Sequence, residues 1–380
     1  MPFTLTPRYI ALGLLVIWLA ILILTGLIHS DVFGLEEGGA KNLILIWSIV
    51  DQIASPVGYY GAPDLRALLL FPVGLYWPGS LFAAKVFTAM ITFAAILLLY
   101  NVNKTQDNEA AIISSALLII SPIVITQIDA IGSGPYLLLC FALAHVADRR
   151  YRSAAHHLSG WFFIQILIIA LAVSLHPLGL AYPIALVWIW TREQEKVAFK
   201  KAAIISAIIT TMVILVFRNG WPDLHDWLVN PVQLLSDAAV NGLSGLDGRA
   251  NIGVGVLLFS ILAYIIIKDW RNTFASLTGR TLVLGAIIGM VHADASWAML
   301  VLSLVLMRGI PLLIQANDSF KAEHFVGQRG PVLLGTFIIA ILFMLSNKSY
   351  VHHKGLELVA PVDAVIRAIC AEAIDPDKPF

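Results

Sequence analysis

Three carboxylates that closely follow the first apolar run are the residues best suited to chemistry. Asp31, Glu36 and Glu37 lie just beyond a stretch long enough to cross a bilayer, so they fall at a predicted membrane boundary. Partial desolvation there raises the pKa of a carboxylate and a neighbouring cation lowers it, which is how a general base is tuned. The alternative is an ordinary solvated loop charge at each position. Three acids this close together weaken that alternative without removing it.

The composition indicates the class of protein that must position these acids. The chain has 380 residues, of which 59% are hydrophobic and 13% charged, and its mean hydropathy is +0.85. These values predict an all-α polytopic membrane protein, because a spanning helix satisfies every backbone amide internally. A formal net charge of zero, with no basic stripe interleaved with aromatic residues, argues against a nucleic-acid partner. Cys140 and Cys370 lie far apart in the sequence, so neither a disulfide nor a cysteine metal site is expected.

About eleven transmembrane spans are predicted from apolar runs near the length that a bilayer requires. They lie near residues 8–28, 80–101, 109–127, 134–148, 159–175, 177–191, 201–217, 252–268, 280–293, 295–309 and 330–346. The first run is longer than the apolar core of a signal peptide and lacks a small-residue cleavage site, so we expect it to be retained. Residues 1–346 would form one transmembrane domain.

The basic residues predict the orientation of these spans. With the N-terminus in the cytoplasm, the predicted inner loops hold Lys104, the Arg149–Arg150 pair and most other Lys and Arg residues, as the positive-inside bias requires. The first loop (29–79), a second loop (218–250) and the short C-terminal tail (347–380) would then face outward. Within the first loop, 40–54 has the apolar face of a helix lying in the interface, and a Pro- and Gly-rich return follows it. Such a loop can cover a cavity that opens into the membrane.

The order of these features resembles the GT-C membrane glycosyltransferases. The likeness rests on a span, an acidic outward loop, an interface helix, a Pro-rich return, and a second span beginning Gly-Ser-Leu-Phe-Ala-Ala-Lys-Val at 79–86. A Ser-Pro-apolar turn at 121–127 and a small-residue turn with His-Pro-Leu-Gly at 176–179 extend it to about residue 195. Within the family, the chain is similar to the branch of protein O-mannosyltransferases and the aminoarabinose transferases that act on lipid A.

The resemblance implies a periplasmic-facing enzyme in a bacterial inner membrane that takes a sugar from a polyprenyl-phosphate carrier. The acceptor, whether glycan, lipid or protein, is not indicated. No cofactor is certain, a divalent cation is possible, and its ligands are unknown. The acidic pair of the family falls on Glu36 and Glu37, and Asp31 is a second candidate base. The candidate contacts to the phosphate or substrate are Lys85, Arg66, Asp64, His176, Arg218 and Asp129. The ordinary alternatives are snorkelling for Lys85, lipid headgroup contact for Arg66 and a turn cap for His176.

Two departures from the family pattern motivate a second hypothesis. Glu36 stands where the family has an aspartate, and the turn at 128–135 keeps only Asp129 where relatives carry an Arg and then an acid. Since catalytic placement is sensitive to small changes in reach, the chain is alternatively a non-catalytic subunit that binds lipids or partner membrane proteins. A transporter is a third possibility, but the two halves of the chain show no matching pair of interrupted spans.

Overall fold

The computed structural model describes residues 7–24, 46, 65–77, 80–104, 107–153, 160–192, 276–289 and 295–324, with isolated positions between 204 and 211 and between 268 and 274. Every regular element in these ranges is a helix, which confirms the all-α fold class for the described part of the chain. Several predicted features lie outside these ranges: Asp31, Glu36, Glu37, Asp64, Arg218, the interfacial helix at 40–54, the 218–250 loop, the tail at 347–380 and most of the spans at 201–217, 252–268 and 330–346.

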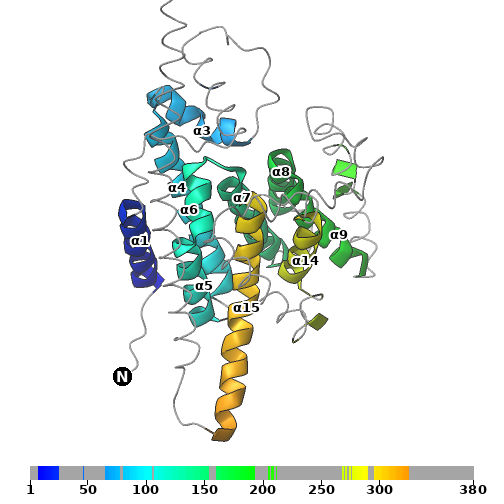
Figure 1. The fold of residues 1–380 in the computed structure, drawn as a ribbon. Helices are drawn as coiled ribbons and strands as arrows, with labels where there is room; N and C mark the ends of the chain where they lie inside the picture. The colour runs from blue at the N-terminus through cyan, green and yellow to red at the C-terminus, as the bar shows by residue number, and fades with distance from the viewer. Residues whose placement is uncertain are drawn as a thin grey trace, which may run out of the picture.

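The remaining predicted apolar segments fall on helices (Figure 1). The elements, in chain order, are α1 (Pro7–Leu24), α3 (Leu65–Tyr76), α4 (Leu81–Asn103), α5 (Asn108–Ile120), α6 (Pro122–Asp129), α7 (Ser133–Ser153), α8 (Gly160–Leu175), the 3-10 turn η1 (Pro177–Leu180), α9 (Ala181–Arg192), α14 (Leu277–Gly289) and α15 (Ala295–His324). One of them, α4, is long and apolar enough to cross a membrane, and the bent pair α5 and α6 would be a second if it forms one span. The figure of eleven spans therefore stays a prediction.

Two element boundaries differ from the sequence expectation. The segment 109–127, expected as one span, is divided at Ser121 into α5 and α6, which meet at an angle of 50°. Pro122 explains the break, because proline disfavours helical backbone at the residue before it and serves well at a first helical position. At the other boundary, α15 continues to His324, although the apolar run was expected to end at residue 309. The good helix formers after Pro311 extend the helix beyond the stretch that hydropathy detects.

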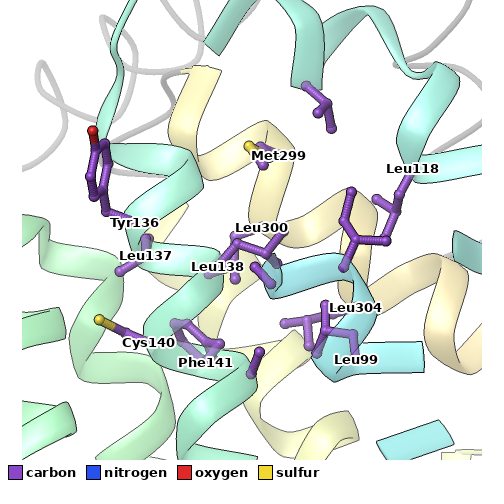
Figure 2. Close-up of a cluster of buried hydrophobic side chains, with 14 of the residues drawn as sticks. Leu99, Leu118, Tyr136, Leu137, Leu138, Cys140, Phe141, Met299, Leu300 and Leu304 are labelled. Carbon is purple, nitrogen blue, oxygen red and sulfur yellow. The ribbon is translucent and has the colours of Figure 1, made fainter. Parts of the chain in front are cut away.

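Helix α4 lies at the centre of the packing and contacts α7, α5, α3 and α6. Its buried positions repeat every three to four residues, and Ala84, Thr88, Thr92 and Ala95 are small enough to let neighbouring backbones approach closely. Figure 2 shows the adjoining apolar core, in which side chains of α4, α5, α7 and α15 meet. Leu99, Phe141, Leu300 and Leu304 are among its buried members.

Polar side chains join the helices at a few buried points. The Ser114 hydroxyl on α5 donates to the carbonyl oxygen of Leu306 on α15 at 3.0 Å. The Tyr182 hydroxyl on α9 donates to the Ala144 carbonyl oxygen at 2.9 Å and accepts from the Gln165 amide at 3.1 Å. These bonds link α7, α8 and α9, and hydrogen bonds between helices are a usual source of association where the surroundings are apolar.

Candidate phosphate-binding site

Three of the predicted phosphate or substrate contacts meet at one end of α4, where α3, α6 and α7 also converge (Figure 1). We call Arg66, Lys85 and Asp129 the Lys85 cluster. Arg66 lies in the first turn of α3, Lys85 in the second turn of α4, and Asp129 is the last residue of α6. The sequence separations are large, so the fold, and not local structure, brings Lys85 to Asp129 and Arg66 to the backbone just after Asp129.

The centre of the cluster is a buried ion pair. Lys85 Nζ lies 2.6 Å from Asp129 Oδ1, and each side chain is only 3% exposed. A charge this far from solvent is costly unless it is paired, and the carboxylate supplies the partner that the ammonium requires. Lys85 therefore directs its charge into the protein and does not snorkel to the interface.

Arg66 reaches the same segment from α3. Its side chain is 5% exposed, and Nη1 makes a long hydrogen bond of 3.5 Å to the carbonyl oxygen of Ile131. Ile131 has a φ of 50°, a left-handed conformation that is strained for a β-branched residue. Strained backbone concentrates at functional sites, where the surrounding structure maintains it. Two cations thus contact residues 129–131 from two different helices.

A tight turn positions this segment. The amide N–H of Gly134 donates to Gln127 Oε1 at 3.1 Å, and a Cβ on Gly132 would lie 2.2 Å from that same oxygen. The glycine at position 132 therefore leaves room for the Gln127 side chain that closes the turn. Next to it, the Thr88 and Tyr136 hydroxyls are 2.9 Å apart and join α4 to α7.

Arg66, Lys85 and Asp129 were each identifiable from the sequence, whereas their pairing and the supporting residues Gln127, Thr88 and Tyr136 were missed. The signal for the turn was present in Gly132-Ser133-Gly134-Pro135, a strong turn composition after an apolar run. The partners of the ion pair are 44 residues apart. A separation of that size carries no local pattern that could reveal the contact.

His176 caps a turn. Its Nδ1 accepts the amide N–H of Leu178 at 3.1 Å, which begins the 3-10 turn η1. Helices α7 and α8 pack together across a short connection and so run antiparallel, which places His176 at the same end of the bundle as the start of α7 and the Lys85 cluster. The capping alternative is therefore observed, and a role for this side chain in binding phosphate stays a prediction.

Within the described ranges, no group of three His, Cys, Asp or Glu side chains could hold a metal ion. The carboxylates of the first loop, among which the predicted base lies, are outside those ranges. The chain matches no protein-family model, and a comparison with curated proteins gives no match.

Proposed function

We propose that this chain is an integral-membrane glycosyltransferase of the GT-C type, which moves a sugar from a polyprenyl-phosphate carrier to an acceptor on the outer face. The observation that supports it best is the buried meeting of Arg66 and Lys85 on residues 129–131. Among the described side chains of the Lys85 cluster, two carry a positive charge and one a negative charge. Cationic side chains suit an anionic leaving group, and these two lie at the start of α4, which follows the acidic first loop in the sequence.

The proposed reaction is an inverting transfer. Glu36 or Asp31, assisted by Glu37, accepts the proton of the acceptor hydroxyl as its oxygen attacks the anomeric carbon. The bond from that carbon to the phosphate oxygen breaks, and the polyprenyl phosphate leaves with the electron pair. Lys85, Arg66 and Arg218, with or without a divalent cation, stabilise the charge that develops on the phosphate. In this proposal Asp129 holds the Lys85 ammonium in place before the donor binds.

Exposed apolar side chains support the membrane setting. Helix α1 exposes Leu12, Val16 and Ile23, with 56%, 60% and 59% of their surfaces accessible, and α8 exposes Phe163 and Leu167 similarly. Continuous faces of this kind are unfavourable in water and are normal against lipid. A donor with a polyprenyl chain would be held in the same phase as these faces.

The test is turnover by the full-length protein in lipid nanodiscs, measured as release of polyprenyl phosphate from a panel of polyprenyl-phosphate-linked hexoses and aminopentoses. Either Glu36 or Asp31 is the proposed base. We expect the variant that removes it, either Glu36→Gln or Asp31→Asn, to lower the rate by about 10²- to 10⁴-fold. Glu109→Gln is the matched control, because Glu109 is an exposed acid in the first turn of α5, at the opposite end of α4. Full activity in both loop variants would refute the mechanism.

The second candidate is a non-catalytic membrane subunit, and the closed ion pair favours it. At 2.6 Å and 3% exposure, Lys85 and Asp129 satisfy one another as a structural pair does. This candidate predicts copurification with partner membrane proteins in fixed stoichiometry and no release of polyprenyl phosphate from any donor. Robust turnover by the purified chain alone would eliminate it.

A further inference from the structure

A second polar site lies at the opposite end of α4 from the Lys85 cluster. The last turns of α4 and α7 border a half-open cavity of about 400 Å³. Its described lining is Asn101, Val102, Val146, Arg149 and Arg150, and we call it the arginine cavity. Its volume falls within the range of small-ligand sites.

The arginine cavity has a strongly cationic lining. Both guanidinium groups come from consecutive residues of α7, and both side chains are exposed. Lys104 is a third cation near the cavity, because its Nζ donates a hydrogen bond to Oδ1 of the lining residue Asn101 at 2.6 Å. Guanidinium groups suit phosphate oxygens, which they can contact through two parallel hydrogen bonds.

From this geometry we infer that the arginine cavity binds the phosphate headgroup of an anionic phospholipid of the adjacent leaflet. Val102 and Val146 add apolar surface beside the cations, and this combination fits a headgroup with its first acyl carbons better than a free phosphate ion. The predicted orientation places this end of α4 on the cytoplasmic side, where basic pockets between membrane helices meet anionic lipids. The inference requires embedding in a membrane and does not require the transfer reaction.

The test is native mass spectrometry of the full-length protein in detergent micelles with added phosphatidylglycerol or phosphatidylcholine. We expect the wild-type protein to retain phosphatidylglycerol with about tenfold preference, because each basic group near the headgroup favours an anionic lipid. The double variant Arg149→Gln/Arg150→Gln should lose this preference. Arg271→Gln is the matched control, since Arg271 is a described arginine that stacks on Trp270 and does not line the cavity.

A second variant tests the cavity without changing its charge. Val146→Phe places a larger side chain in the lining and should lower phosphatidylglycerol retention, whereas Arg149→Lys/Arg150→Lys should keep most of it. Equal retention of the two lipids by the wild-type protein would overturn the inference, as would unchanged retention in both the glutamine pair and Val146→Phe. Displacement of phosphatidylglycerol by millimolar inorganic phosphate would also overturn it, in favour of a soluble phosphate ligand.

Discussion

At the scale of single residues, the main question is whether the ion pair between Lys85 and Asp129 is structural or holds a phosphate-binding lysine in place. Both charges are removed from water, and each compensates the charge of the other. A purely structural pair and a phosphate-binding lysine held by its carboxylate share this geometry. The two roles differ in how stability and donor turnover respond when one or both partners are changed.

We predict that Lys85→Met or Asp129→Asn alone lowers the free energy of unfolding by about 3 to 5 kcal/mol, because each leaves a buried group without its charged partner. The double variant Lys85→Met/Asp129→Leu should recover most of that loss. Thermal unfolding in detergent, read as a double-mutant cycle, measures the coupling. Lys104→Met is the matched control: that lysine is partly exposed and should change stability by less than about 1 kcal/mol.

Additive losses in the cycle would contradict the pairing of these two side chains. If the double variant recovers stability, and neither it nor the wild-type protein releases polyprenyl phosphate from a donor, the pair is structural and the non-catalytic candidate gains support. Loss of donor turnover in a stable double variant would instead support the proposed role of Lys85 in holding phosphate.

The candidate site could be predicted from the sequence only residue by residue. Lys85 was identifiable because an ammonium inside an apolar run requires a partner. Asp129 was identifiable because it is the one acid kept in the turn at 128–135 when the chain is compared with the family it resembles. Their contact depends on how α4 and α6 pack. The strained Ile131 and the Gln127 side chain that closes the turn were not identifiable, since neither residue type is unusual in an apolar segment.

At the scale of elements, the lengths of the apolar runs predicted where the helices lie, whereas the break at Ser121 and the end of α15 were not predicted. The run at 80–101 predicted α4 within two residues, because a long apolar segment with few helix breakers leaves few alternatives. The division at Ser121 depended on a proline within an otherwise continuous run. The extension of α15 to His324 lies in polar sequence, where helix propensity and not hydropathy determines the structure.

Close packing at the turn after α8 gives a prediction for this element. A Cβ on Gly179 would lie 2.2 Å from the backbone oxygen of Ala172, and backbone cannot move aside as a flexible side chain can. We predict that Gly179→Ala lowers the free energy of unfolding by about 1 to 3 kcal/mol through overpacking. Thermal unfolding of the purified protein in detergent measures it.

Gly285 provides the matched control for this substitution. It lies inside α14, and a Cβ there would meet nothing within 4 Å. Gly285→Ala should therefore leave stability unchanged or raise it by up to about 1 kcal/mol, since alanine is the better helix former. If both substitutions destabilise the protein equally, the close approach of η1 to α8 is not the reason why position 179 requires a glycine.

At the scale of the whole molecule, the fold class was predictable and the number of spans is untested. Composition favours a membrane protein, because few polar residues are left to cover a surface of this size, and this setting stays a prediction. The relative placement of the acidic first loop and the Lys85 cluster depends on residues outside the described ranges.

Side-specific labelling tests the predicted topology. In a Cys140→Ala/Cys370→Ala background, Tyr76→Cys near the end of α3 should react with a membrane-impermeant thiol reagent only from outside. Lys104→Cys, after the last turn of α4, should react only from the cytoplasmic side. The 23 residues of α4 span about 35 Å, enough to separate the two positions by a bilayer. Reaction of both cysteines from one side would refute the placement of α4 across the membrane.

The central claim is that the end of α4 which carries Arg66 and Lys85 binds the phosphate of a lipid-linked donor. The most direct measurement is electron cryomicroscopy of the protein in nanodiscs that retain native lipids. We predict an elongated polyprenyl-like density whose head lies within hydrogen-bond distance of Arg66 or Lys85 and faces Glu36 or Asp31. A closed apolar interior around Lys85, with both acids in water and no headgroup density beside the cations, would contradict the claim.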